Sequence, residues 1–291
     1  MVWTEVPDPE AGPGKVLIEV AASGVNRADL LQVAGHYPPP PGAPPYPGLE
    51  VSGTVDGAPV CALLGGGGYA EKVAVDAEHV LPVPNGISLT EAASLPEVAC
   101  TVWSNLTMLA HLDAGETVLI HGGGSGIGTF AIQYAKALGA NVIATARAFK
   151  HKALKDLGAD ETVDYTTDDW SAVRADVILD IMGASYLERN LKALNTNGRL
   201  VIIALQGGAQ AEINLGVVMG KRATVAGTTL RARPDHEKTK IIQGVHRDVW
   251  PLIGNAIKPV IDRSFPLSHA AQAHALMTSN QHVGKVLLLP G

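Results

Sequence analysis

The fold is decided by the stretch Val118-Leu119-Ile120-His121-Gly122-Gly123-Gly124-Ser125-Gly126-Ile127-Gly128. Its first residues are apolar, which is typical of a buried strand, and residues 127–138 have the apolar spacing of a helix. The glycines therefore form a turn from a strand into a helix. Unpaired backbone N–H groups and the positive end of the helix dipole attract a pyrophosphate there, and a side chain would block its approach. This context predicts a dinucleotide-binding turn.

The register of these glycines departs from the fingerprint G-x-G-x-x-G. If Gly128 is the third glycine, Gly123 is the first and Ser125 takes the place of the second. A shifted frame reads Gly126-x-Gly128-x-x-Ala131. The chain contains 32 glycines, so some clustering arises by chance and a purely structural turn remains an alternative. The strand and the helix on either side favour the dinucleotide site.

Strands and helices alternate beyond this turn. The sequence predicts strands at residues 117–121, 141–145, 177–180, 199–204 and 223–227, with helices at 127–138 and 151–157. Apolar strands that alternate with helices predict a parallel sheet covered on both faces. Residues 15–83 instead contain short β-like runs between Gly and Pro, and residues 260–289 return to short mixed elements. The predicted fold class is α/β, with a doubly wound parallel sheet and a separate β-rich part.

Composition excludes several classes of protein. The chain of 291 residues is 46% apolar, carries a net charge of −6 and has no cluster of Lys and Arg, which argues against nucleic acid or an anionic membrane as a partner. The first residues lack a signal-peptide pattern, and no run approaches the roughly 20 apolar residues of a membrane span. Cys61 and Cys100 have neither metal nor redox spacing. We expect a cytoplasmic protein that acts on small molecules.

The residues after the second predicted strand indicate which dinucleotide is bound. A carboxylate about 20 residues beyond the glycine turn commonly binds the ribose 2′-hydroxyl of NAD. Here the strand is followed by Arg147 and Lys150, with no acidic residue nearby. Cationic side chains suit a 2′-phosphate, so the sequence predicts NADPH rather than NADH. Ordinary solvated charges are the alternative.

Three segments carry a resemblance to a known family, namely residues 24–31 (GVNRADLL), 47–53 (PGLEVSG) and 121–128 (HGGGSGIG). With them the sequence resembles the zinc-independent quinone oxidoreductases of the medium-chain dehydrogenase/reductase superfamily, in particular the p53-inducible quinone oxidoreductase subgroup. The likeness continues through residues 180–186, 228–231 and 282–286. It implies a GroES-like catalytic domain of residues 1–99 and 255–291, a Rossmann domain of residues 100–254, an active site between them, and a homodimer formed through the Rossmann domain.

The resemblance also implies that no metal is bound. Zinc-dependent relatives place a metal-binding Cys where this chain has Asn26, and they carry a four-cysteine lobe that is missing here. His36, His79 and His111 have no partners at metal-ligand spacing, so we expect surface or core roles for them.

The resemblance assigns the candidate site residues position by position. The adenosine diphosphate half of NADPH is expected to contact Thr101, Gly123, Gly124, Ser125, Gly126, Ile127, Gly128, Arg147, Lys150 and Tyr165. The nicotinamide side is expected to contact Met182, Gly183, Ala204, Leu205 and Gly207. Thr229, Leu230 and Arg231, at the border of the cleft, are also assigned to the cofactor. The substrate is expected to face Asn26, Tyr37 and Tyr46. Because residues 37–48 are rich in proline, simple packing of the two tyrosines on pyrrolidine rings is the alternative.

The sequence departs from the family pattern in three places. The family pattern has a first strand ahead of the position of Trp3 and a longer connection at residues 55–60, so we expect a trimmed catalytic domain here. Ala148 and Phe149 replace a polar pair near the expected 2′-phosphate, so the preference for NADPH depends on Arg147 and Lys150 alone.

The predicted reaction is hydride transfer from C4 of NADPH to a quinone or a similar conjugated carbonyl, without a metal. The protein has to align the donor and the acceptor and exclude water. Negative charge on the acceptor oxygen would be met by the Asn26 amide or a tyrosine hydroxyl, and the last proton would come from solvent. Two alternatives remain: an enoyl or alkenal reductase that adds hydride to a carbon–carbon double bond, and an NADPH-binding sensor or structural protein without turnover.

Overall fold

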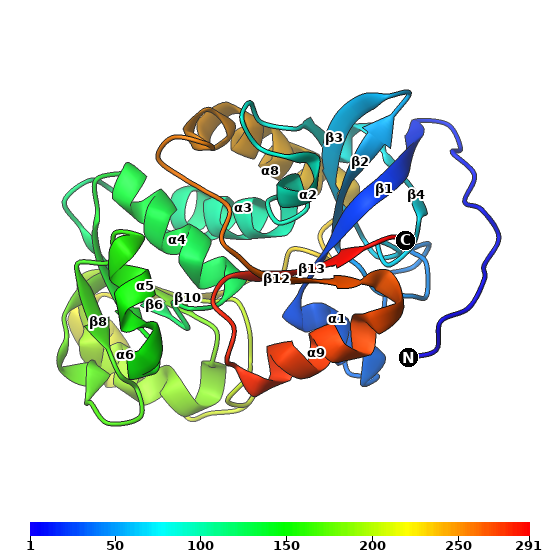
Figure 1. The fold of residues 1–291 in the computed structure, drawn as a ribbon. Coiled ribbons are helices and arrows are strands. Elements are labelled where there is room, and N and C mark those ends of the chain that lie inside the picture. The colour runs from blue at the N-terminus through cyan, green and yellow to red at the C-terminus, as the bar shows by residue number, and fades with distance from the viewer. The chain divides into compact units, whose positions relative to one another are not determined.

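The computed structural model describes residues 1–291 and divides into two compact units (Figure 1). Unit 1 comprises Met1–Cys100 and Leu230–Gly291, so both ends of the chain contribute to it. Unit 2 comprises Thr101–Thr229. No helix of the structure is both long and apolar enough to cross a membrane.

Unit 1 is built on a seven-stranded sheet. Its strands are β1 (Lys15–Val25), β2 (Glu50–Val55), β3 (Ala58–Leu63), β4 (Lys72–Asp76), β5 (Val80–Pro82), β12 (Ile261–Pro266) and β13 (Lys285–Leu289), in the order β12-β13-β1-β2-β3-β5, with β4 also paired to β1. Strand β1 is antiparallel to β2 and to β13, so the last strand of the chain lies beside the first. Alternate residues of these strands, among them Ile18, Val20 and Val51, form a buried core.

Helices complete unit 1. They are α1 (Arg27–Val33), α2 (Leu89–Ala92), the start of α3 (Pro96–Trp103), α8 (Asp235–Asp248) and α9 (Ala270–Ser279). Helix α9 contacts β12 and β13 and buries Ala273 and Met277 against Val25, Val286 and Leu288. Helix α1 and strands β2 and β13, which belong to the same unit, come from segments far apart in the sequence.

Unit 2 contains a six-stranded parallel sheet. Its strands are β6 (Thr117–His121), β7 (Asn141–Thr145), β8 (Glu161–Val163), β9 (Ala175–Asp180), β10 (Leu194–Ile202) and β11 (Thr224–Gly227), in the order β11-β10-β9-β6-β7-β8, with every pair parallel. Its helices are α4 (Gly126–Ala137), α5 (His151–Asp156), α6 (Leu187–Ala193) and α7 (Leu215–Lys221). The strand order reverses between β6 and β9, as in doubly wound Rossmann sheets.

The predicted α/β class and the main strands of unit 2 are confirmed, with shifted ends for β10, which begins at Leu194 and ends at Ile202. The three-residue strand β8 is absent from the sequence prediction. Residues 230–254, expected in the Rossmann domain, lie in unit 1 instead. There α8 contacts the turn Ala77–His79, and Trp250 Nε1 donates to Pro82 O at 2.8 Å. An amphipathic helix does not reveal from its own sequence which neighbour covers its apolar face.

Candidate functional site

The carboxyl edge of the unit 2 sheet collects most of the predicted cofactor residues. Dinucleotides bind in doubly wound sheets at this edge, where the strand order reverses. The glycine turn follows β6, Arg147 and Lys150 follow β7, and Tyr165 follows β8. Met182 and Gly183 follow β9, while Ala204, Leu205 and Gly207 follow β10. Five parallel strands thus bring these residues to one edge, as the alternating pattern of the sequence requires.

Ser125 explains the broken register of the glycine turn. It is the N-cap of α4: its Oγ accepts a hydrogen bond from Gly128 N at 3.0 Å and donates one to Gly122 O at 2.8 Å. Gly122 has a φ of 69°, in the left-handed region that favours glycine. A Cβ on Gly128 would collide with Gly122 O. The serine therefore fixes the turn, while Gly128 allows strand and helix to approach each other.

Lys150 lies across the glycine turn. A Cβ on Gly124 would lie 2.5 Å from Lys150 Cδ, so the missing side chain makes room for the lysine. Lys150 is 7% exposed, and Arg147 is half-buried. The Asp164 carboxylate accepts a hydrogen bond from Ala148 N at 2.8 Å and holds the intervening backbone. Two cationic residues and the helix N-terminus thus lie at the same edge of the sheet.

Asp180 shapes the end of β9. Its two carboxylate oxygens accept hydrogen bonds from Met182 N at 2.8 Å and Gly183 N at 2.9 Å. Burial raises the pKa of this carboxyl to about 6. The loop after β10 is joined to the same turn, because Gly207 N donates to Met182 O at 2.7 Å and a Cβ on Gly207 would collide with Ser185. The predicted nicotinamide residues therefore belong to two loops, after β9 and after β10, that are hydrogen-bonded to each other.

Asn105 connects Thr101 to the end of β11. It lies in a π-helical segment, Ser104–Leu109, and its Nδ2 donates to Thr101 O at 2.7 Å. Its Oδ1 accepts from Thr228 Oγ1 at 3.0 Å. Thr101 and Thr229 were both predicted as cofactor contacts. The Asn105 amide joins the backbone of Thr101 to Thr228, the residue before Thr229. π-Helical segments occur often at functional sites, but no sequence pattern reveals them.

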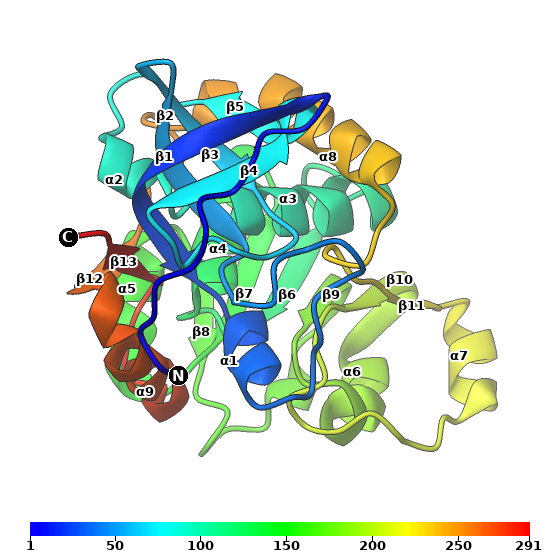
Figure 2. The same cartoon turned by 90° about the vertical axis from the view of Figure 1, so that its right-hand side faces the viewer.

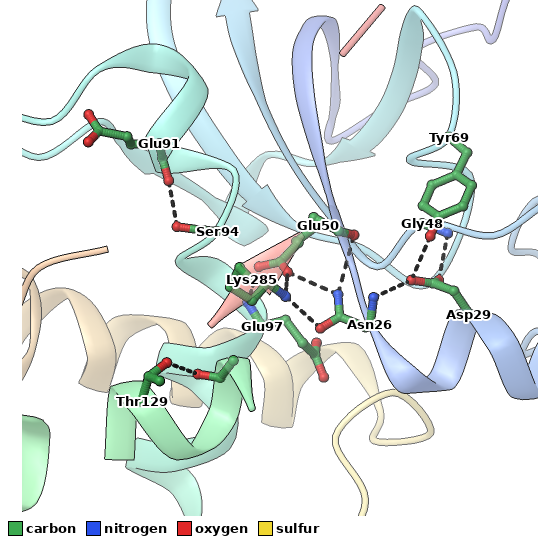
Figure 3. Close-up of polar contacts among 12 residues, drawn as sticks. Asn26, Asp29, Gly48, Glu50, Tyr69, Glu91, Ser94, Glu97, Thr129 and Lys285 are labelled. Carbon is green, nitrogen blue, oxygen red and sulfur yellow. Dashed lines mark hydrogen bonds and ion pairs between the residues drawn. The ribbon is translucent and has the colours of Figure 1, made fainter. Parts of the chain in front are cut away.

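Unit 1 contains a buried charged cluster around Asn26 (Figure 3). Asn26 is the N-cap of α1, Glu50 begins β2 and Lys285 begins β13. Lys285 Nζ forms an ion pair with Glu50 and donates to Asn26 Oδ1 at 2.8 Å, while Asn26 Nδ2 donates to Glu50 Oε1 at 2.9 Å. Glu50 is 0% exposed and Lys285 5%. The amide of Asn26 is therefore held in one orientation.

A second polar chain adjoins this cluster. The Asp29 carboxylate accepts hydrogen bonds from Asn26 N at 2.7 Å, Gly48 N at 2.9 Å and the Tyr69 hydroxyl at 3.2 Å (Figure 3). Tyr69 also bonds His274 Nε2 on α9 at 3.0 Å. Burial raises the pKa of Asp29 to about 6 and lowers the pKa of His274 to about 4. Burial thus shifts both equilibria toward the uncharged forms.

The remaining predicted residues lie around the proline loop, which we define as residues 37–48. Tyr37 and Tyr46 are half-buried on it. Burial raises the pKa of the Tyr37 hydroxyl, and the nearby Glu97 carboxylate adds to the shift. Leu230 and Arg231 lie in unit 1, and Arg231 donates to Tyr37 O of this loop at 3.3 Å.

Sequence reasoning missed Glu50, Lys285, Asp29, Asn105 and Asp180. Glu50 and Lys285 are charged residues at the starts of apolar strands. That position, where burial is expected, was the only sequence signal that the two could form a pair. No three or more His, Cys, Asp or Glu side chains gather in a way that could hold a metal ion.

Comparison with known proteins now gives the family. Residues 12–60 match the family model described as "Alcohol dehydrogenase GroES-like domain", and residues 157–288 match "Zinc-binding dehydrogenase". Quinone oxidoreductase of Rattus norvegicus is 30% identical over 98% of this chain and 91% of its own length.

Solved structures agree with these matches. Quinone oxidoreductase of Thermus thermophilus, determined also in complex with NADPH, has a TM-score of 0.88 and 33% identity over 98% of this chain and 95% of its own. The Escherichia coli quinone oxidoreductase complexed with NADPH has a TM-score of 0.85 and 26% identity over 99% and 95%. The chain belongs to the quinone oxidoreductase family of the medium-chain dehydrogenase/reductase superfamily.

Proposed function

We propose that this oxidoreductase is a metal-free, NADPH-dependent quinone reductase. The observation that carries the proposal is the cationic pair Arg147 and Lys150, which follows β7 beside the glycine turn in the place where NAD enzymes have a carboxylate. The names of relatives at about 30% identity and the NADPH complexes of two structural neighbours support it.

The residues of unit 2 fit the cofactor. The glycine turn leads into α4, and the backbone N–H groups at the start of this helix suit a pyrophosphate. Arg147 and Lys150 would hold the 2′-phosphate. Bound there, NADPH supplies the hydride.

The residues of unit 1 fit the acceptor. With its raised pKa, the Tyr37 hydroxyl stays protonated at neutral pH and can donate a hydrogen bond to a developing oxyanion. Lys285 and Glu50 fix the Asn26 amide, whose Nδ2 makes only a long second contact, to Gly24 O at 3.4 Å. Solvent supplies the last proton in this proposal.

The same residues do not fit a zinc ion. Zinc sites in proteins use three or four Cys, His or carboxylate ligands, and no such group gathers in this chain. At Asn26, the position of the zinc-binding Cys in related enzymes, the Lys285 ammonium lies 2.8 Å from the amide oxygen and would repel a cation.

The reaction is tested by following NADPH oxidation with a series of quinones and a series of 2-alkenals. We expect turnover of quinones that is unaffected by EDTA. Turnover of alkenals alone would identify an alkenal reductase instead. Tight binding of NADPH without oxidation in either series would identify a binding protein and reject the enzyme.

The cofactor preference is tested with the double variant Arg147→Ala/Lys150→Ala. Because charge-assisted hydrogen bonds contribute about 1.5–3 kcal/mol each, we expect NADPH binding to weaken by about a hundredfold and NADH binding to change little. The matched control is Lys152→Ala/Lys155→Ala, which removes two exposed lysines from α5. Fluorescence titration of both nucleotides measures the effect, and equal losses for NADPH and NADH would refute the assignment.

We also infer a homodimer. Strand β11 ends its sheet with one edge unpaired. Helix α7, which lies between β10 and β11 in the sequence (Figure 2), has the exposed apolar side chains Leu215 and Met219. A second copy would cover both.

A further inference from the structure

Arg231 is buried in unit 1, although the resemblance assigned it to the cofactor. It is 6% exposed, and no other arginine is buried. We propose that Arg231 is a positioning residue that fixes the proline loop, residues 37–48, and with it Tyr37, and that it is not a cofactor ligand. This inference rests on the proposed function only where it treats the loop as facing the substrate.

Each nitrogen of the Arg231 guanidinium has a partner in unit 1. Nε donates to Gly65 O at 2.8 Å, Nη2 to Gln32 Oε1 at 2.7 Å and Nη1 to Tyr37 O at 3.3 Å. The guanidinium carbon also lies 5.3 Å from the centroid of the Tyr37 ring, within the range of a cation–π contact. One planar group therefore holds the end of α1, the start of the proline loop and the loop after β3.

Gln32 extends this anchor to the far end of the loop. While its Oε1 accepts from Arg231, its Nε2 donates to Pro45 O at 2.9 Å. The backbone of the β3–β4 connection binds the same end, because Gly67 N donates to Tyr46 O and Tyr69 N donates to Pro47 O, both at 3.0 Å. The proline loop is thus held at both ends by donors from outside it.

The composition of the loop explains why it needs external donors. Proline has no backbone N–H, so a segment this rich in proline cannot form a ladder of its own hydrogen bonds, while its carbonyl groups still require donors. A guanidinium with five N–H groups in a planar fork meets several carbonyls at once, whereas a lysine ammonium is a single point. Arg231 supplies one such donor directly, to Tyr37 O, and it binds the side chain of Gln32, which supplies another to Pro45 O.

Placement of Tyr37 is the functional consequence. The guanidinium contacts both its carbonyl and its ring, so the position of the hydroxyl depends on Arg231. Small displacements of a positioning group can reduce enzymatic rates by about a hundredfold. Loss of the Arg231 guanidinium should therefore raise KM for the acceptor without lowering the affinity for the cofactor.

The test is the variant Arg231→Lys, compared with Gln32→Met and with the control Arg263→Lys, an exposed arginine of β12. For Arg231→Lys we expect KM for 1,4-benzoquinone to rise by about tenfold, since at least one charged hydrogen bond is lost. NADPH binding, measured by fluorescence, should stay within about twofold, because no contact to the cofactor is removed. Gln32→Met should act in the same direction with a smaller effect, and Arg263→Lys should change nothing.

Hydrogen exchange of residues 35–48 provides a readout that needs no turnover. We expect faster exchange of these residues in Arg231→Lys and Gln32→Met, with unchanged exchange in unit 2. Unchanged exchange in both variants overturns the proposal, and so does a loss of NADPH affinity as large as the rise in KM. If the wild-type protein reduces no quinone, the proposed function fails, while faster exchange would still support the anchoring role of Arg231.

Discussion

At the scale of single residues, an ion pair and two hydrogen bonds hold the Asn26 amide in place. Lys285 faces Glu50 and Asn26 together, and Glu50 also accepts a hydrogen bond from Glu97 N at 2.9 Å, at the start of α3. Taking two charges out of water is costly, and close pairing with further hydrogen bonds is needed to offset it. The identity of Asn26 is thus tied to two residues that lie 24 and 259 positions away.

The first prediction follows from this pairing. Lys285→Met leaves the Glu50 carboxylate buried without a cation, and such changes reduce the free energy of unfolding by about 3–5 kcal/mol. The double variant Lys285→Met/Glu50→Gln should regain part of that loss, because no uncompensated charge remains. Urea unfolding measures all three proteins.

Lys152→Met is the matched control. It breaks the exposed ion pair with Asp156, at 2.7 Å on α5, and exposed pairs contribute at most about 1 kcal/mol. A single variant Lys285→Met as stable as this control would show that the buried pair is not coupled to folding.

At the scale of elements, strong periodic patterns were predictable from the sequence and weak ones were not. The strand at residues 117–121 and the helix after it are confirmed because apolar periodicity and the glycines agree. Strand β8 has only three residues, and no sequence pattern distinguishes the π-helical segment Ser104–Leu109 from an ordinary helix, so neither feature could be predicted. The role of Ser125 as a helix N-cap could have been read from the sequence, since serine is a preferred capping residue.

A prediction about assembly belongs to this scale. Leu215 and Met219 of α7 are 64% and 76% exposed, and β11, the next element of the chain, has an unpaired edge. Sedimentation should therefore give twice the 30.2 kDa of one chain, and Leu215→Glu/Met219→Glu should give a monomer. Leu31→Glu/Val33→Glu, on the exposed face of α1, is the control that should remain dimeric. A dimer that survives the α7 substitutions would place the interface elsewhere.

At the scale of the whole molecule, the placement of residues far apart in the sequence is what the sequence alone could not provide. The class of the fold follows from local patterns, but the attachment of α8 to unit 1 depends on contacts such as Trp250 with Pro82. The same holds for Arg231, whose partners Gln32 and Gly65 precede it by 199 and 166 positions. Buried polar contacts of this kind join segments that carry no shared local signal.

Each unit also contains a buried acid and a buried histidine with opposite effects on stability. In unit 1 these are Asp29 and His274, and in unit 2 Asp180 and His121, whose pKa burial lowers to about 4. The acids have folded pKa values of about 6 against 3.8 unfolded, so the folded state binds more protons and stability falls as the pH rises through this window. The histidines have folded values of about 4 against 6.5 unfolded, so the unfolded state binds more protons and stability rises with pH there.

The two effects cover nearly the same range and oppose each other, so these four groups should leave the stability of the wild-type protein nearly constant between pH 4 and 6. Removing one acid should leave the effect of the histidines in excess, and removing one histidine should leave the effect of the acids in excess. Asp180→Asn should make the free energy of unfolding rise with pH, and His274→Gln should make it fall, whatever the change in absolute stability. The exposed His269→Gln is the control that should keep the wild-type slope. Urea titrations at several pH values measure the slopes, and parallel profiles for all four proteins would show that these groups do not titrate differently on folding.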